Sequence, residues 1–564
     1  MKKNRTFLIT GVLCLILSFA MMFVYNIPTM NEQVLTFTST YKSLDVTLEA
    51  TYYEKENAEY AVLICPGYSC DRQKWRPFAD LYLRNGLSVM SFDYSGQGAS
   101  TGVIGFDNAK TDNIPMEIND ALDFLHQVSG IPYDHIILHG HSMGGRSILR
   151  LLSDYNNPEA QTTVEKRDIK NVILLSPEVN YKHNAQASLF AGTNDESEEP
   201  WKSFNENFIK GTNVYIFGST ADDVVDDVSI LQIYRHIGGK NMPDSGVYYG
   251  TETNSVGSKI TVGTVKGVLH SYQMYSSKFT KLVSDAVSDI TGNEPVNSPT
   301  ITLIYLSWLF ALLGIYMTIK GMNLNYEGNI NDTVPEIVNI KKFLLQKLLF
   351  WIPGLLIAGI LCSVCVVIPF GSPIMNIPYM CFIAGYGIFM LFYYLKKKKK
   401  NVKGKLPEFT LRVKIEKKDI LPVILLTAGI LFFTWYILFG SMYRLVPFNY
   451  RMFWLFFNSI LMTIGYYISG IETDMLKNAS GKERFLYSLI QYVPLFLFTL
   501  FYAIIKSYSG FIGQIQNLIL LYILCIPLGE FIKRRTHSRL LGALITGFTF
   551  QTLMITSAAL IAIF

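Results

Sequence analysis

A serine lies between Gly140 and Gly144 in the stretch GHSMG, and this spacing is typical of a catalytic serine. The apolar run 136–138 before it predicts a strand, and residues 146–152 after it predict a helix. The turn between such a strand and helix is tight enough to require glycine at the flanking positions, and it holds the serine hydroxyl clear of the sheet. The pattern therefore predicts a nucleophile at Ser142, and the alternative is a solvated serine in an ordinary glycine turn.

Two further stretches, LICPGY at residues 63–68 and SFDYSGQGASTG at residues 91–102, accompany this motif. With them, residues from about 45 to 290 resemble the α/β-hydrolase superfamily and, within it, the monoacylglycerol lipase and lysophospholipase-like branch. The resemblance implies a mostly parallel sheet flanked by helices. It also implies that the backbone N–H groups of Tyr68 and Met143 form the oxyanion hole, although Pro66 replaces the usual histidine of that loop. One such donor is commonly worth about 3 to 4 kcal/mol in the transition state.

The same resemblance implies the acid and the base that a serine nucleophile needs. It aligns Asp222 with the acid, and Asp223 is the alternative because the turn before it is one residue longer than usual; the pair could otherwise cap the next helix. His270 follows the acid and precedes a helical stretch, where the family places its base; the alternative is a surface histidine. A neutral imidazole is required, so activity is expected to fade below about pH 6.5.

Other segments of this region are predicted to have supporting roles. Asp93 lies in the family's Asp-x-x-Gly-x-Gly loop, and we expect it to be structural. The resemblance implies a short acidic lid at residues 178–212, and the alternative is a solvated loop. Residues 238–264 are rich in Gly, Ser, Thr and Asn, which predicts an enlarged surface loop.

Composition narrows the class of protein. The chain has 564 residues, of which 50% are hydrophobic and 14% aromatic, so we expect at least two domains and a membrane part. The net charge is only +5, and the basic residues gather in short runs beside apolar segments, which predicts no nucleic-acid partner. The seven cysteines do not cluster with histidines, so neither a metal nor another cofactor is expected. Cys65 and Cys70 are expected to be free thiols, with a disulfide as the alternative.

Long apolar runs predict nine transmembrane helices, because each run is long enough to cross about 30 Å of hydrocarbon. The run at residues 7–27 is longer than a signal peptide core, which favours an uncleaved anchor over cleavage near Ser18-Phe19-Ala20. We expect an N-terminal anchor at residues 1–35, an α/β-hydrolase domain at 36–292 and an all-α polytopic membrane domain at 293–564. The eight later runs are 299–319, 343–370, 375–395, 420–441, 452–471, 485–505, 511–532 and 540–563.

The charges between these runs predict the orientation. One set of alternate loops carries most of the Lys and Arg residues, including Lys396–Lys400, while the opposite loops hold only Arg444, Arg451 and Lys506. The positive-inside rule then places the N-terminus in the cytoplasm and the hydrolase domain outside a multi-pass cell-membrane protein.

The runs contain almost no ionisable residues, which argues against a translocation path. Lys347 and Glu530 are expected near the inner ends of their helices, where they can reach the membrane interface.

These observations predict a membrane-embedded serine hydrolase that cleaves a carboxylic ester, of a lipid or an acylated envelope component, at the outer face of the cell membrane. A serine peptidase or aminopeptidase and an acyltransferase of the same fold are alternatives. An alternative of another class is a catalytically silent binding or receptor module on a membrane bundle. The sequence identifies neither a protein partner nor a role for the eight later spans.

Overall fold

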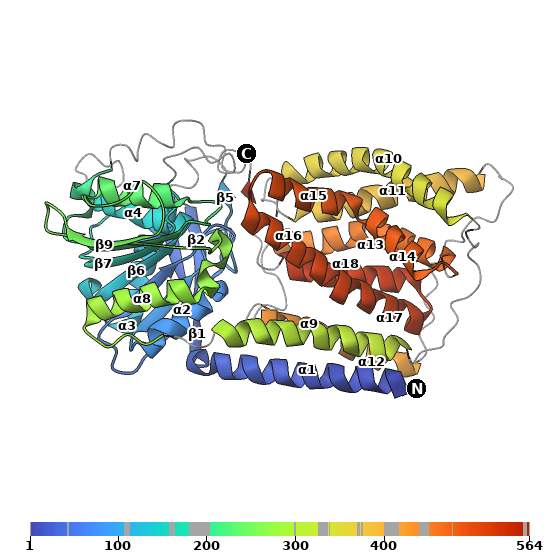
Figure 1. Cartoon of the computed structure of the whole chain (residues 1–564), viewed down its shortest axis with the longest axis horizontal. Helices are drawn as coiled ribbons and strands as arrows, with labels where there is room; N and C mark the ends of the chain where they lie inside the picture. The colour runs from blue at the N-terminus through green and yellow to red at the C-terminus, as the bar shows by residue number, and fades with distance from the viewer. Residues whose placement is uncertain are drawn as a thin grey trace. The chain divides into compact units, whose positions relative to one another are not determined.

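The computed structural model of the chain has two compact units (Figure 1). The sheet unit comprises Phe23–Tyr305 and the short segment Ala503–Gly510; the helical unit comprises Met1–Met22, Leu306–Tyr502 and Phe511–Ala562. The structure describes residues 2–41, 44–105, 113–156, 164–179, 204–297, 301–324, 337, 339–368, 373, 376–399, 417–438, 450–476, 478–555 and 561–562.

The sheet unit is built on nine strands in the order β1-β2-β4-β3-β6-β7-β8-β10-β9. The six strands from β4 to β10 in this order pair in parallel, and β1, β2 and β9 pair antiparallel at the two edges. The mostly parallel sheet predicted from the sequence is therefore confirmed. The strands are β1 (Glu32–Tyr41), β2 (Leu44–Tyr53), β3 (Ala61–Cys65), β4 (Ser88–Phe92), β6 (Ile136–His141), β7 (Asn171–Leu175), β8 (Asn213–Ser219), β9 (Tyr248–Thr253) and β10 (Lys259–Val265).

Helices cover both faces of this sheet, which explains why its central strands are buried along their whole length. Every residue of β3, β4, β6 and β7 is buried. On one face the apolar side chains of α3 (Asn113–Ser129), α4 (Met143–Asn156) and α7 (Asp227–His236) join the core. On the other face α2 (Arg76–Arg84) and α8 (Ser277–Thr291) do so.

Short 3-10 helices and one two-residue strand complete the described part of the sheet unit. They are η1 (Ile27–Thr29), η2 (Arg72–Trp75), β5 (Ile104–Gly105), η4 (Tyr133–His135), η6 (Glu206–Ile209) and η7 (His270–Tyr275).

One expectation about the sheet unit is wrong, and another lies mostly outside the described residues. The segment 238–264 is not a surface loop, because it contains the hairpin of β9 and β10, and β10 pairs in parallel with β8. The sheet begins at Glu32, inside the predicted anchor segment 1–35. Most of the expected lid, residues 180–203, is not among the described residues.

The helical unit consists of long apolar helices. Six described stretches are long and apolar enough to cross a membrane, and a pair bent by 63° could form a seventh, Gly481–Gln491 with Val493–Ile504. The predicted runs 420–441 and 540–563 correspond to shorter apolar helices in the described residues, so the number nine stays a prediction. The six stretches are Arg5–Thr29, Ile301–Met322, Ile340–Val366, Ile377–Lys397, Arg451–Met475 and Tyr508–Thr536.

The last predicted run does not remain helical to its end. Its helix, α18, ends at Ile555, and Ile561–Ala562 is extended as β11. The other elements outside the sheet are α1 (Lys2–Asn26), α9 (Ile301–Leu324), α10 (Ile340–Val366), α11 (Ile377–Lys399), α12 (Lys417–Leu438), α13 (Arg451–Met475), α14 (Gly481–Gln491), α15 (Val493–Ile504), α16 (Tyr508–Leu520), the π-helical turn η8 (Leu521–Cys525), α17 (Ile526–Thr536) and α18 (Arg539–Ile555).

The N-terminal helix packs closely on α9 through small and polar residues. The Ser18 hydroxyl donates to the Ser307 carbonyl at 2.7 Å, and the Ser307 hydroxyl donates to the Ser18 carbonyl at 2.9 Å. A Cβ added to Gly314 would lie 3.0 Å from the Gly11 carbonyl oxygen, so the two backbones approach closely there. Small residues and interhelical hydrogen bonds of this kind are typical of helix pairs in membranes.

The helical unit contains a buried ion pair, which corrects the expectation for Lys347. The Lys347 ammonium is fully buried and pairs with the Glu472 carboxylate, so it does not extend to an interface. The Tyr386 hydroxyl donates to Glu472 at 2.8 Å and the Tyr487 hydroxyl at 2.9 Å. Glu472 lies near the end of α13, one residue beyond the apolar run 452–471, which is why the sequence analysis missed it.

Candidate active site

Ser142 occupies the sharp turn between β6 and α4. Its φ is +52°, a left-handed conformation that costs free energy outside glycine and that marks a constrained site. A Cβ added to Gly140 would lie 2.7 Å from the Gly145 Cα, and one added to Gly144 would overlap the Cys65 carbonyl oxygen. The two glycines of the motif are therefore required by close backbone contacts, as the sequence predicted.

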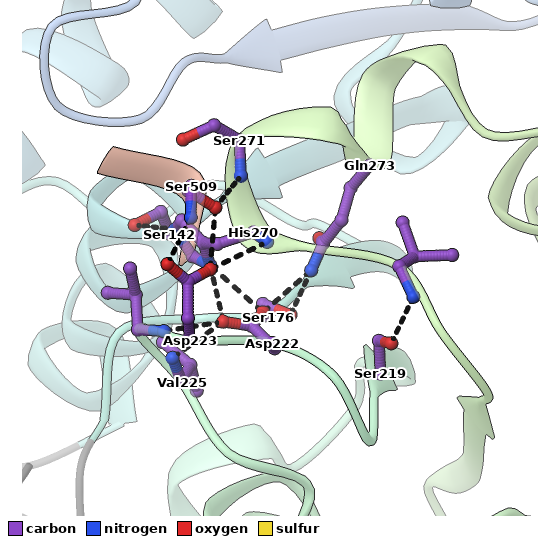
Figure 2. A network of polar contacts seen from close by, with 12 residues as sticks. Ser142, Ser176, Ser219, Asp222, Asp223, Val225, His270, Ser271, Gln273 and Ser509 are labelled. Atoms are coloured by element: carbon purple, nitrogen blue, oxygen red, sulfur yellow. Dashed lines mark hydrogen bonds and ion pairs between the residues drawn. The ribbon is translucent and has the colours of Figure 1, made fainter. Parts of the chain in front are cut away.

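The structure brings His270 to Ser142 across 128 positions of sequence (Figure 2). The His270 Nε2 atom lies 2.9 Å from the Ser142 Oγ atom, which is hydrogen-bond distance. His270 is the first residue of η7, after β10, and it is 6% exposed. The hairpin of β9 and β10 was expected to be a loop. Its second strand, β10, leads to His270 at the C-terminal edge of the sheet.

The other ring nitrogen of His270 contacts Asp222. The Nδ1 atom lies 2.9 Å from Oδ2 and 3.0 Å from Oδ1 of that carboxylate. Asp222 follows β8, and its Oδ1 also accepts the N–H groups of Val224 and Val225 at 2.9 and 2.8 Å. The carboxylate therefore closes its own turn as well as contacting the imidazole.

Ser142, Asp222 and His270 all lie beyond the carboxyl ends of parallel strands, namely β6, β8 and β10. In open α/β sheets this edge is where ligands bind, because the strand ends and the following turns meet there. The geometry allows a proton to pass from the Ser142 hydroxyl to the imidazole while the carboxylate fixes the ring tautomer.

Charged neighbours raise the pKa of His270 above its ordinary value of 6.5. Burial alone would lower this pKa, but the charge and hydrogen bond of Asp222 and the charges of Asp223 and Glu178 outweigh burial. His141, whose ring centroid lies 4.7 Å from that of His270, behaves differently. Burial and the neighbouring His270 hold the pKa of His141 well below 6.5, so this second imidazole is neutral.

The loop with the expected oxyanion donors lies against the serine. A Cβ added to Gly67 would be 3.1 Å from the Ser142 Cβ, so the backbone of this loop approaches the serine closely at Gly67. Met143 is the first residue of α4, and the first N–H groups of a helix have no carbonyl partner within it. That the Tyr68 and Met143 N–H groups form the oxyanion hole stays a prediction.

Asp93 supports this loop, which confirms its predicted structural role. The buried carboxylate forms an ion pair with the Arg72 guanidinium and accepts the Arg72 backbone N–H at 2.7 Å. It also accepts the N–H of Ala99 at 2.9 Å. The glycine loop after β4 and the segment after residue 68 are thereby held together.

Two side chains beside the acid were not predicted. The Gln273 amide donates to Asp222 Oδ2 and to the Ser176 hydroxyl, each at 2.7 Å. Ser509, 286 residues from Asp223, donates its N–H to Asp223 Oδ2 at 2.6 Å and its hydroxyl to Asp223 Oδ1 at 2.5 Å. No motif surrounds either residue, so the sequence carried no signal for them.

Within the described part of the chain, no group of three or more His, Cys, Asp and Glu side chains is arranged to hold a metal ion. Cys362 and Cys365 form a C-x-x-C pair in α10, so the expectation that the chain has no such pair is wrong. Cys65 and Cys70 are free thiols, as expected.

Comparison with known proteins gives a family likeness for part of the chain. Residues 56–203 match the family model "Serine aminopeptidase, S33". No curated protein matches the chain.

Solved structures that resemble the chain include three hydrolases. An esterase from Pyrococcus furiosus is 17% identical with a TM-score of 0.30, covering 46% of this chain and 90% of its own. A predicted CIB-like hydrolase from Thermoplasma acidophilum is 15% identical with a TM-score of 0.31, covering 47% and 100%. A thermophilic esterase from Thermogutta terrifontis is 16% identical with a TM-score of 0.34, covering 48% and 96%.

The parallel sheet, the turn at Ser142 and the matched family model agree with one another. The sheet unit is an α/β-hydrolase domain whose family likeness is to the S33 serine hydrolases, joined in one chain to apolar helices that are long enough to span a membrane.

Proposed function

We propose that the protein is a membrane-embedded serine hydrolase that cleaves carboxylic esters through a covalent acyl-enzyme. The observation that carries the proposal is the continuous contact from the Ser142 hydroxyl through His270 to Asp222, at 2.9 Å for each link. A surface serine or a cap for the next helix needs no such chain of contacts. All three side chains are nearly buried, which strengthens their electrostatic coupling.

The proposed reaction has two halves. His270 takes the Ser142 proton as the hydroxyl oxygen attacks the ester carbonyl carbon, and the Tyr68 and Met143 N–H groups stabilise the oxyanion. His270 then gives the proton to the leaving alcohol, which leaves an acyl group on Ser142. Water, activated by the same imidazole, releases the acid and restores the serine.

The proposed substrate is an amphipathic ester, a lipid or an acylated envelope component, reached at the outer face of the cell membrane. This part of the proposal rests on the apolar helices and on the positive-inside pattern of the loops. Covalent attachment to membrane helices keeps the site close to such a substrate and raises its effective concentration.

Peptide-bond cleavage is the second candidate, because the matched family model is that of a serine aminopeptidase. The same nucleophile, base and oxyanion donors serve esters and amides, so the triad does not distinguish between them. Acyl transfer to an alcohol other than water is a variant of the first candidate, in which the acceptor competes with water for the acyl-enzyme.

A fluorophosphonate probe tests the nucleophile directly. We expect the full-length chain in detergent to be labelled and the Ser142→Ala variant to lose labelling completely, because only the activated hydroxyl forms the phosphonate ester. Ser153→Ala is the matched control, since this serine lies in the same helix, α4, away from the contact chain. An intact, folded protein that takes up no probe would favour the silent binding module instead.

A substrate panel then separates the two catalytic candidates. Acyl esters of graded chain length and aminoacyl amides should be compared with the same preparation. Turnover of esters that rises with chain length supports the lipid ester proposal, whereas turnover confined to aminoacyl amides would replace it with the aminopeptidase.

A further inference from the structure

The sheet unit includes a segment from far along the chain, Ala503–Gly510. This segment contains the end of α15 and the beginning of α16. Ser509, the second residue of α16, is 7% exposed and touches the turn that bears the acid (Figure 2). The hydrolase fold inferred from residues 56–203 has no need of this segment, so its contact requires a separate explanation.

Ser509 connects the acid turn with the histidine turn. It donates two hydrogen bonds to the Asp223 carboxylate, at 2.5 and 2.6 Å, and its Oγ accepts the N–H of Ser271 at 3.3 Å. Asp223 Oδ1 also accepts the N–H of His270 at 3.3 Å. The two turns are therefore linked by a small closed network in which Ser509 is the bridging residue.

This network involves the residues next to the acid, Asp222, and the base, His270, in the chain. Asp223 is the chain neighbour of Asp222, and Ser271 is the chain neighbour of His270, so a shift of either turn changes the distances at the imidazole. The Asp223 carboxylate is 7% exposed, and an ionised group that is this buried requires hydrogen-bond donors. Bonds to an ionised acceptor are the stronger kind, which suits them to fixing a position.

We propose that Ser509 is a positioning residue, which holds the acid turn and the histidine turn at the separation that proton transfer between Ser142 and His270 requires. The inference rests on the proposed function and adds to it a residue outside the α/β-hydrolase segment. It also gives the segment Ala503–Gly510 a role in the chemistry of the sheet unit.

The test compares full-length variants purified in detergent, with fluorophosphonate labelling and ester turnover as readouts. Ser509→Ala should lower kcat about tenfold with little change in KM, because it removes one bond to a charged group and an acceptor for Ser271. Ser507→Ala is the matched control, since that serine is equally buried in the same segment and the network does not include it. Ser509→Thr keeps the hydroxyl and should restore most of the rate.

The pH profile provides a readout that a merely structural role would not move. The groups that face His270 are Asp222, Asp223 and Glu178, which raise its pKa, and the neutral His141. Ser509→Ala removes a hydrogen bond to the Asp223 carboxylate, so the charge of Asp223 should raise the pKa of His270 further. The acid limb of kcat/KM should therefore move to higher pH. Asp223→Asn removes the charge and should move the limb to lower pH.

The outcomes separate this inference from the proposed function. If the wild-type chain is not labelled at all, the proposed function fails. If the wild type is labelled and Ser509→Ala matches Ser507→Ala in rate and in acid limb, the positioning role is overturned. If Ser509→Ala does not fold, Asp223→Asn carries the test: a lower acid limb with reduced kcat supports the role, and an unchanged kcat overturns it.

Discussion

The charge around His270 sets the pH range in which the site can work. A general base must be neutral before it takes a proton, and three nearby carboxylates, Asp222, Asp223 and Glu178, favour the protonated imidazole. Their effect exceeds that of burial, so the pKa of His270 lies above 6.5. Activity should therefore be lost as the pH falls through this raised pKa, at a higher pH than an unperturbed histidine would give.

The corresponding prediction concerns Asp222→Asn. This change removes the largest of the causes that raise the pKa of His270, so the acid limb of kcat/KM should fall below the wild-type value. The amide also favours the wrong ring tautomer, which should reduce kcat by about 10⁴-fold. The measurement is the rate of fluorophosphonate labelling between pH 5 and pH 9.

Asp285→Asn is the control for that experiment, because Asp285 is a partly exposed carboxylate of α8 paired with Lys281. A wild-type limb at or below pH 6.5 would contradict the electrostatic argument. An Asp222→Asn variant with wild-type turnover would remove Asp222 from the mechanism.

At the residue scale, the residues that could be predicted from the sequence are those of a motif whose backbone geometry or chemistry requires a particular residue type. The turn around Ser142 requires glycines, so Gly140 and Gly144 are readable from the sequence. Gln273 and Ser509 act through contacts between distant turns, and hydrogen bonds of that kind leave no local pattern. The acid was left open between two neighbours, and the structure gives both a contact: Asp222 contacts the imidazole, and Asp223 accepts from the backbone of His270 and from Ser509.

Among the elements, the buried ion pair of Lys347 and Glu472 ties four helices of the helical unit. Lys347 comes from α10, Tyr386 from α11, Glu472 from α13 and Tyr487 from α14. The Lys347 ammonium also lies 4.1 Å from the centroid of the Tyr386 ring. Each polar group of this cluster depends on the others for its hydrogen bonds, because a buried group cannot form them with water.

Breaking this pair should be costly. Lys347→Met leaves the Glu472 carboxylate buried without its cation, and we expect a loss of about 3 to 5 kcal/mol in the stability of the helical unit. The double variant Lys347→Met with Glu472→Gln removes both charges and should recover part of that loss. Thermal unfolding in detergent, followed by tryptophan fluorescence, provides the measurement.

Lys482→Met is the control for charge removal alone, because Lys482 is an exposed lysine of α14. Equal stability of Lys347→Met and the wild type would show that the pair contributes nothing. A double variant that is less stable than either single change would show that the charges are not coupled in the way the distances indicate.

Element prediction from the sequence followed hydrophobic patterning, and it failed where patterning is weak. The apolar runs located the long helices, and the strand before Ser142 was recognised. The hairpin of β9 and β10 was missed because Gly263, Thr261 and Thr264 look like loop residues. In the sheet they are compatible with a strand, since the Thr264 hydroxyl accepts from the Tyr248 backbone and the Thr261 and Thr251 hydroxyls pair across the hairpin at 3.0 Å.

For the whole molecule, the orientation of the chain in the membrane is the main prediction. Charge asymmetry predicts that the N-terminus lies inside the cell and Ser142 outside. A membrane-impermeant fluorophosphonate should therefore label intact cells as fully as it labels permeabilised ones. An epitope at the N-terminus should be accessible only after permeabilisation, and this serves as the internal control.

Labelling that appears only after permeabilisation would reverse the orientation and place the substrate inside the cell. The α/β-hydrolase fold of the sheet unit would stand in either case, because it does not depend on the side of the membrane. The division into a sheet part and an apolar helical part was predictable from composition along the chain. The membership of Ala503–Gly510 in the sheet unit was not, because that segment looks like any short connection between two apolar runs.

The split composition of the sheet unit has a consequence for how the protein is made. A ribosome that has finished residue 305 has supplied every strand of the nine-stranded sheet, yet it must continue to residue 510 of 564 before the segment Ala503–Gly510 of that unit exists. Throughout this interval the nascent domain lacks the two hydrogen bonds that Ser509 donates to the Asp223 carboxylate. If Ser509 positions the two turns, a chain truncated before residue 509 would retain Ser142, Asp222 and His270 but would lack the contact that links the acid turn to the histidine turn.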